Sequence, residues 1–138
     1  RARCVVLEPQ TFMNRSGESV RAAFDFLHAE DERIVVVHDE LDFEFGRLGI
    51  KRGGGHGGHN GLRDIISQCG GNDFLRLRLG IGHPGHAAEV VDYVLRKAPS
   101  SEQSLIDRAL DDALRVFPRI VAEQFDQAMQ TLHTRAPA

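Results

Sequence analysis

The chain has 138 residues, of which 41% are hydrophobic and 27% are charged, and its formal net charge is −3. This length and apolar content predict one domain with one hydrophobic core. The small negative charge excludes a general affinity for polyanions. The charge is unevenly spread, however, because residues 46–80 carry six cations and only two anions. Positive charge therefore gathers around a glycine-rich segment in the middle of the chain.

Cys4 and Cys69 have no metal-binding spacing, so we expect two reduced, buried thiols. The sequence shows no signal peptide and no apolar run of membrane-spanning length. These features predict a cytoplasmic protein that does not enter a membrane. The chain begins with Arg1 and reaches an apolar run by residue 4, which is typical of a fragment.

The first third of the chain predicts two strands around a helix. Residues 4–7 form an apolar run closed by Pro9 and indicate a buried strand. Ser16 is a candidate N-cap for a helix that ends near residue 28. Residues 34–37 are four β-branched residues, typical of a strand covered on both faces. Asp39 follows this strand at its carboxyl end, where functional groups of open α/β sheets lie.

The middle of the chain alternates weakly over residues 47–52, which predicts a strand leading into the glycine-rich segment. Asn60 is a candidate N-cap for the short helix that follows. Residues 74–81 alternate apolar and basic side chains, which predicts a strand with one buried and one solvated face. Arg76 and Arg78 would share the solvated face.

The last third of the chain predicts helices. Residues 87–95 indicate one, and Ser100 with Gln103 resembles a capping box that opens a long one. Pro118 should kink or split this long helix. Residues 134–138 should fray. We therefore predict a single α/β domain over residues 1–138.

Residues 53–61 (GGGHGGHNG) contain six of the fourteen glycines and need a reason beyond connecting two elements. Glycine backbone that leads into a helix can hold phosphate, but no GK[ST] sequence follows, which argues against a nucleotide-triphosphate enzyme. A metal site is disfavoured because a glycine loop holds His56 and His59 poorly. The remaining polar set suits hydrolysis by activated water. Its members are Asn14, Asp39, His59 and Asn60.

Four segments closely resemble bacterial peptidyl-tRNA hydrolase in order and spacing: residues 8–17 (EPQTFMNRSG), 38–42 (HDELD), 53–61 and 76–85 (RLRLGIGHPG). The resemblance covers residues 3–133. It implies a monomeric, cytosolic α/β protein with a mixed, twisted sheet flanked by helices. It also implies cleavage of the ester between peptide and tRNA without metal or cofactor, with peptidyl-tRNA as the partner through its acceptor arm and nascent peptide.

Carried over by position, the resemblance assigns Asp39 as the aspartate that orients the catalytic histidine. It places Phe12 and Asn14 near the scissile ester, with Asn60 as the asparagine that binds substrate beside them. Met13 and His59 would line the same groove. The cations that would clamp phosphates of the acceptor arm, a salt-sensitive contact, are Lys51, Arg52 and Arg78.

The chain departs from the family pattern at its start, because the catalytic histidine of the family lies on a segment before the position of Arg1. The resemblance therefore predicts a sheet without its first strand and slow turnover by these 138 residues alone. Gly49 stands where the family often has a lysine. A tRNA-binding module without catalytic activity is the alternative, and the sequence encoded upstream of Arg1 distinguishes the two.

Overall fold

The computed structural model describes residues 4–27, 34–83 and 99–135, which divide into two compact units. The described part of the first unit consists of residues 37–51, 76–83 and 99–135. The second unit holds residues 4–27, 34–36 and 52–75. The helix expected at residues 87–95 lies outside the described residues, as do residues 136–138.

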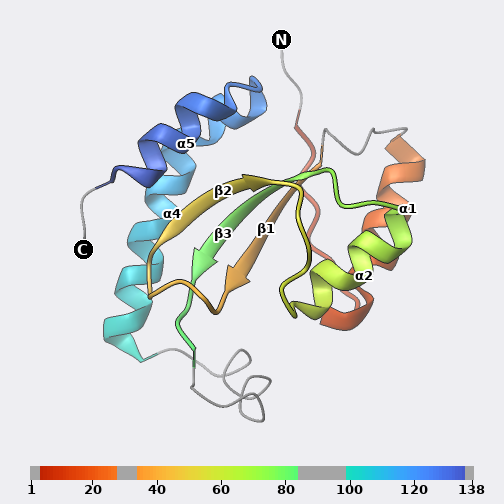
Figure 1. Ribbon diagram of the computed structural model, residues 1–138, viewed down its shortest axis with the longest axis horizontal. Coiled ribbons are helices and arrows are strands. Elements are labelled where there is room, and N and C mark those ends of the chain that lie inside the picture. The colour runs from red at the N-terminus through yellow and green to blue at the C-terminus, as the bar shows by residue number, and fades with distance from the viewer. Residues whose placement is uncertain (1–3, 28–33, 84–98, 136–138) are drawn as a thin grey trace. The chain divides into compact units, whose positions relative to one another are not determined.

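Three strands, β1 (Val35–Glu40), β2 (Leu48–Arg52) and β3 (Leu75–Gly80), form a sheet in the order β1-β3-β2. Bonds from Leu75 N to Ile34 O and from Ile81 N to Glu40 O make β1 and β3 parallel. Bonds from Gly53 N to Phe74 O and from Gly80 N to Arg47 O make β2 antiparallel to β3. The sheet is therefore mixed, as the arrow directions in Figure 1 show.

The faces of these strands differ from the sequence prediction in two places. Arg76 is buried, with 2% of its surface exposed, whereas we expected it on the solvated face of its strand with Arg78. Val37 of β1 is 54% exposed, although we expected both faces of this strand to be covered. Alternation predicts which side chains share a face, but it does not determine what covers that face.

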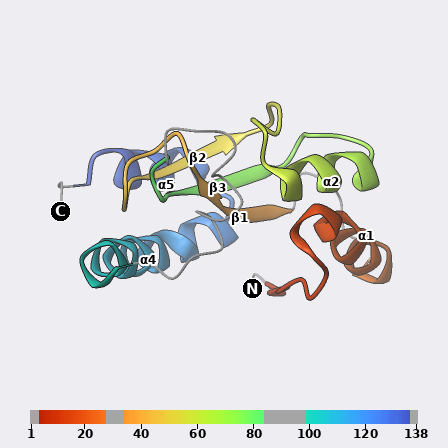
Figure 2. The same cartoon turned by 90° about the horizontal axis from the view of Figure 1, so that it is seen from below.

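The second unit contains a 3-10 turn, η1 (Met13–Arg15), and two helices, α1 (Ser16–Leu27) and α2 (Asn60–Cys69). The two helices lie side by side in this unit (Figure 2). Apolar side chains of α2 are buried at Leu62 and Ile65, whereas those of α1 are at most half-buried. The core that the two helices form with β1 and the residues before β1 and β3 has three buried members and five partly buried ones: Leu62, Ile65, Phe74, Val20, Ile34, Val36, Ile66 and Cys69.

Residues 4–7 do not form the buried strand that we predicted. The segment has no regular structure, and Val6 is 84% exposed. Cys4 is exposed as well, so the expectation of two buried thiols is wrong for this cysteine, while Cys69 is half-buried. A four-residue apolar run favours burial, but a strand also needs a hydrogen-bonding neighbour, and the run cannot show whether one exists.

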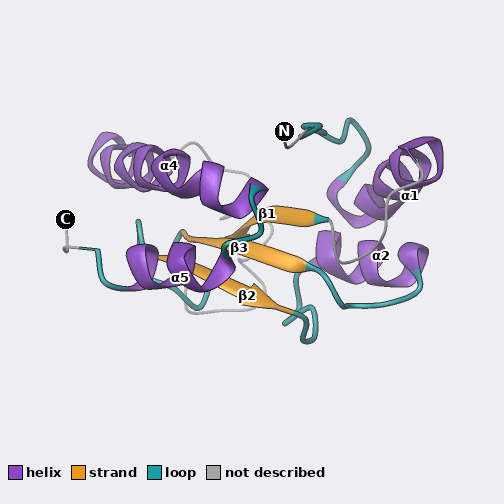
Figure 3. Cartoon of the chain, turned by 90° about the horizontal axis from the view of Figure 1, so that it is seen from above, coloured by secondary structure: helices purple, strands orange, loops and turns teal. Residues whose placement is uncertain are grey.

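The first unit adds two helices in contact with each other, α4 (Ser100–Val121) and α5 (Phe125–His133) (Figure 3). The buried side of α4 follows the i, i+3, i+4 spacing of Ala109, Ala113, Val116 and Ile120. His133 ties α5 to β2, because its Nε2 accepts a hydrogen bond from Ile50 N at 3.1 Å. None of the helices in the described ranges is long and apolar enough to cross a membrane.

The ends of α4 correct two further expectations. Pro99 is the N-cap, and its carbonyl accepts from Gln103 N at 2.8 Å, so Ser100 does not act as the cap of a capping box. The helix is not split at Pro118, because it continues to Val121. The chain is also anchored beyond α5: Arg135 Nε donates to Asp112 Oδ2 at 2.8 Å, although we expected fraying from residue 134.

Candidate functional site

The glycine-rich loop before α2 is held by hydrogen bonds to His56. His59 N donates to His56 O at 2.9 Å, and Gly58 N donates to His56 Nδ1 at 3.0 Å. Gly57 and Gly58 have φ values of 58° and 85°, which favour glycine at both positions. His56 therefore closes the turn that presents His59.

His59, not Asn60 as predicted, is the N-cap of α2. Its Nδ1 accepts a hydrogen bond from Leu62 N at 3.1 Å. A ring nitrogen that accepts carries no proton, so the neutral imidazole bears its hydrogen on Nε2. The cap thus selects the tautomer of His59 and makes Nε2 a donor. Asn60 is the first residue of the helix, and its amide has no role in the cap.

Met13 of η1 and His59 both lie against Gly61. A Cβ on Gly61 would lie 2.8 Å from Met13 Sδ and 2.9 Å from His59 Cε1, closer than side-chain carbons normally approach. Glycine therefore leaves the space that these two side chains occupy. The structure brings together two of the residues assigned to the ester groove, and both come from the second unit.

The amides assigned to the same groove are exposed. Asn14 lies in η1 and Asn60 begins α2, and neither side chain hydrogen-bonds to another described residue. Phe12, the N-cap of η1, is 80% exposed. Two amides and one aromatic ring are thus available on the elements that carry Met13 and His59.

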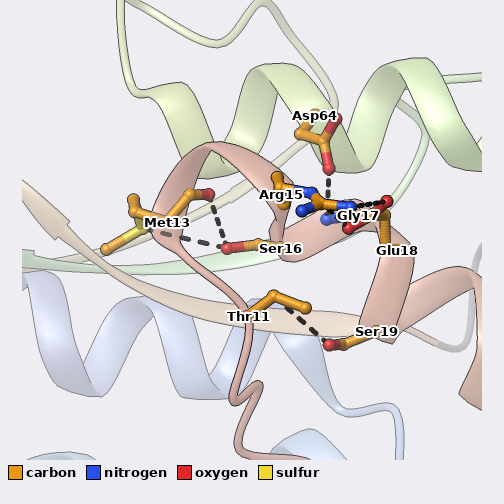
Figure 4. Close-up of polar contacts among 8 residues, drawn as sticks. All are labelled: Thr11, Met13, Arg15, Ser16, Gly17, Glu18, Ser19 and Asp64. Atoms are coloured by element: carbon orange, nitrogen blue, oxygen red, sulfur yellow. Dashed lines mark hydrogen bonds and ion pairs between the residues drawn. The ribbon is translucent and has the colours of Figure 1, made fainter.

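A carboxylate of α2 holds the start of α1. Gly17 N donates to Asp64 Oδ2 at 2.8 Å, as Figure 4 shows. A Cβ on Gly17 would lie 2.6 Å from the carbonyl carbon of Asp64, so the two backbones approach at a distance that only glycine allows. Sequence reasoning missed this contact. An aspartate between apolar helix positions looks like an ordinary solvated residue, and nothing in its spacing indicates the partner.

Asp39 is the second-last residue of β1, in the first unit, and it is half-buried. His38 Nδ1 donates to the carbonyl oxygen of Asp39 at 2.8 Å, which fixes the His38 ring beside the strand. The neighbouring Glu40 Oε1 accepts from Arg78 Nη2 at 2.6 Å and from its Nε at 2.9 Å. The carboxyl end of this strand therefore carries two acidic side chains with different surroundings.

The basic side chains assigned to phosphate binding differ in how they are engaged. Arg78 is paired with Glu40 and also stacks on the Phe43 ring, with its guanidinium carbon 4.4 Å from the ring centre. Arg47 stacks on the same ring at the same distance. Arg52 lies 3.6 Å from Asp73 in the second unit. Lys51 is exposed and makes no ion pair with another described residue.

Two pKa shifts follow from this clustering. Burial alone would raise the pKa of Glu40, but hydrogen bonds from Arg78 and Asp42 N, together with the Arg78 charge, lower it below the usual value. Burial lowers the pKa of Arg76, and the neighbouring charge of Arg78 adds to this effect.

Within the described ranges, no group of three or more histidine, cysteine or acidic side chains could hold a metal ion.

The fold and these groups define an α/β protein with a small mixed sheet flanked by helices, which presents amides, an imidazole N–H and cations. A family model described as peptidyl-tRNA hydrolase matches residues 1–138. The chain belongs to the peptidyl-tRNA hydrolase family. The fold class and the family inferred from the sequence are thereby confirmed.

Relatives and solved structures agree with this family. The chain is 51% identical over 132 residues to a peptidyl-tRNA hydrolase of Delftia acidovorans, covering 96% of this chain and 64% of that protein. It is 55% identical over 131 residues to one from Pseudomonas putida, covering 94% and 68%. The crystal structure of the Acinetobacter baumannii enzyme matches with a TM-score of 0.90 at 51% identity, covering 94% and 66%. The chain thus spans about two thirds of the length of these relatives.

Proposed function

We propose that the protein carrying this chain hydrolyses the ester bond between peptide and tRNA in peptidyl-tRNA, which releases the tRNA of stalled or aborted translation. The observation that carries the proposal is the convergence of Met13 and His59 on Gly61, each next in sequence to an exposed amide, Asn14 or Asn60. Membership of the peptidyl-tRNA hydrolase family supports the same reaction.

The residues divide the work of ester hydrolysis among them. Asp39 orients and polarises a histidine that activates the attacking water. The Asn14 and Asn60 amides and the Nε2–H of His59 donate hydrogen bonds to the substrate, including the carbonyl oxygen where negative charge develops. Phe12 and Met13 supply apolar contact to the peptidyl end. No cofactor takes part in this scheme.

Lys51, Arg52 and Arg78 bind phosphates of the tRNA acceptor arm in this proposal. Such contacts position the substrate and weaken as salt concentration rises. The protein acts in the cytoplasm as a monomer, and the family domain extends over residues 1–138. The alternative, a tRNA-binding module without turnover, is not favoured, because the named relatives are hydrolases at 51–55% identity.

The test is peptidyl-tRNA cleavage by Asp39→Asn under single-turnover conditions, with the chain extended by any residues encoded upstream in the same frame. We expect the cleavage rate to fall by about 10²–10⁴-fold, the usual contribution of acid–base catalysis, while tRNA affinity is unchanged. Asp42→Asn is the matched control, since Asp42 is an exposed aspartate three residues further on. Equal losses of cleavage and binding would give Asp39 a structural role, and no cleavage by the unaltered protein would refute the proposed function.

A further inference from the structure

The contact between Gly17 and Asp64 connects the two segments that carry the groove residues. Gly17 is the second residue of α1, so its N–H has no acceptor within its own helix. Asp64 Oδ2 accepts this hydrogen bond at 2.8 Å across a separation of 47 residues. A carboxylate at a helix N-terminus also interacts favourably with the helix dipole. Asp64 therefore caps α1 from the neighbouring helix.

The anchored residue is directly linked to the Met13 turn. Ser16, which precedes Gly17, is buried, and its Oγ donates to Met13 O at 2.7 Å. The same Oγ lies 3.9 Å from Met13 Sδ. Figure 4 shows Asp64, Gly17, Ser16 and Met13 in this sequence of contacts. Because Ser16 connects Gly17 to Met13, a displacement of Gly17 would also displace Met13.

The other polar contacts around this turn lie on its own segment. Arg15 and Glu18 form an exposed ion pair at 2.7 Å, and Thr11 hydrogen-bonds with Ser19. The pKa of Arg15 is raised, first by its bond to Glu18 and to a smaller degree by the charge of Asp64. Neither pair joins the turn to α2. The Gly17–Asp64 bond thus joins η1–α1 to α2, whose N-cap is His59 and whose first residue is Asn60.

We propose that Asp64 is a positioning residue for ester hydrolysis: by holding Gly17, it sets the Met13–Asn14 turn at the distance from His59 and Asn60 that the substrate requires. This inference rests on the proposed function for its kinetic consequence. Asp64 itself does not touch the reacting atoms in this scheme. Its effect is geometric, and a displacement of about 1 Å in a substrate-contacting group can cost on the order of 10²-fold in rate.

The test compares Asp64→Ala, Asp64→Asn and Glu18→Ala. Alanine removes the acceptor, whereas asparagine keeps one acceptor oxygen. Glu18→Ala is the matched control, because it removes an exposed carboxylate from the same turn without altering a bond to α2. Three properties are measured on each: kcat and KM for peptidyl-tRNA, the fraction folded, and NMR signals of the Met13 methyl group and the His59 ring.

We expect Asp64→Ala to lower kcat/KM per folded molecule by about 10–100-fold and to shift both NMR signals. Asp64→Asn should recover most of the loss, and Glu18→Ala should leave kcat/KM and both signals unchanged. An Asp64→Ala protein that is less stable but keeps its kcat/KM per folded molecule and its Met13 and His59 signals would overturn the inference. If Asp64→Ala does not fold, unchanged signals and kcat/KM in Gly17→Ala would overturn it instead, because a Cβ there must displace the Asp64 backbone.

The two proposals fail in distinguishable ways. If the unaltered protein does not cleave peptidyl-tRNA, the proposed function fails. The geometric part is then decided by the NMR signals alone, which move in Asp64→Ala if Asp64 sets the Met13–His59 distance and stay fixed if it does not. If the unaltered protein is active and the Asp64 variants match it in kinetics and signals, only the positioning role is lost.

Discussion

Met13 and Arg78, two side chains assigned to substrate binding, are held in place in opposite ways. In the second unit, the hydrogen bonds of Gly17 N and Met13 O hold the backbone of the turn, while 47% of Met13 stays exposed. In the first unit, Arg78 is itself engaged by Glu40 and the Phe43 ring. Contacts through the backbone leave a side chain available to a substrate, whereas contacts through the side chain compete with one.

Among the changes that test this contrast between the two regions, the largest effect should come from closing the space above Gly61. Gly61→Ala places a methyl group 2.8 Å from Met13 Sδ and 2.9 Å from His59 Cε1. The His59 ring is held by its bond to Leu62 N, so Met13 must move. We expect kcat/KM for peptidyl-tRNA to fall by about 10–100-fold. Overpacking should cost about 1–3 kcal/mol of folding stability, measured by chemical denaturation.

Gly55→Ala is the matched substitution, in the glycine-rich loop before α2. Its Cβ meets no atom within 4 Å and its backbone does not lie in the left-handed region, so stability should be unchanged. Its loss of turnover should be smaller than that of Gly61→Ala. Equal losses would mean that substrate lies against the loop backbone, and the contrast between backbone anchoring and side-chain availability would then not explain the role of Gly61.

Several elements with an apolar run or regular apolar spacing could be predicted from the sequence. The strand near residue 35 lies where the run of β-branched residues placed it. The strands near residues 48 and 75 and the helices beginning at Asn60 and Ser100 lie where alternating or helical spacing placed them. Their caps could not be predicted. His59 caps α2 through a ring nitrogen, and Pro99 is the N-cap of α4 through its backbone carbonyl. Neither cap therefore depends on the usual hydroxyl or amide side chain.

Contacts between segments distant in the chain also could not be predicted from the sequence. Residues 8–17 and 53–61 were recognised as parts of one site, but nothing in either segment indicates the Gly17–Asp64 bond or the fit of Met13 over Gly61. The burial of Arg76 depends on what covers its face of β3, and local alternation carries no information about that cover. The phosphate-binding role of Arg78 stays a prediction, although its partners Glu40 and Phe43 are now defined.

Replacing Lys51 and replacing Arg78 should differ in their effects on fold stability, although both should weaken tRNA binding. Lys51→Ala should weaken binding and reduce the slope of log affinity against log salt by about 1, with no loss of stability. Arg78→Ala should also destabilise the fold, by about 1–3 kcal/mol, because it removes the stack on Phe43 as well as the partner of the Glu40 carboxylate. The measurements are salt-dependent filter binding and thermal unfolding of the same preparations.

Arg115→Ala is the control for charge alone, since the Arg115 side chain is 76% exposed on α4 and pairs only with Asp112 among the described residues. It should change neither the salt slope nor, appreciably, the stability. The contrary outcome is that Arg78→Ala lowers the salt slope as Lys51→Ala does and unfolds at the same temperature as the unaltered protein. The contacts with Glu40 and Phe43 would then not restrain Arg78, and the proposed contrast between the two regions would be wrong.

The smallest effect concerns the pH dependence of the Glu40–Arg78 pair. The folded-state pKa of Glu40 lies below its usual value, so the pair stabilises the fold fully above the unfolded pKa of about 4.5. This contribution is lost as pH falls through the lower, folded-state pKa. It should amount to no more than about 1 kcal/mol, as for other partly exposed pairs.

The unfolding temperatures of the unaltered protein and Glu40→Gln should therefore differ by a constant amount between pH 5 and 7, and the difference should shrink below pH 4.5. Glu44→Gln, which alters an exposed carboxylate near the same cluster, should show no such trend. A Glu40→Gln difference that does not shrink as the pH falls below 4.5 would mean that the carboxylate charge is not what holds Arg78. The Phe43 stack would then be the stronger restraint, and Arg78 could turn from Glu40 to a phosphate at little cost in stability.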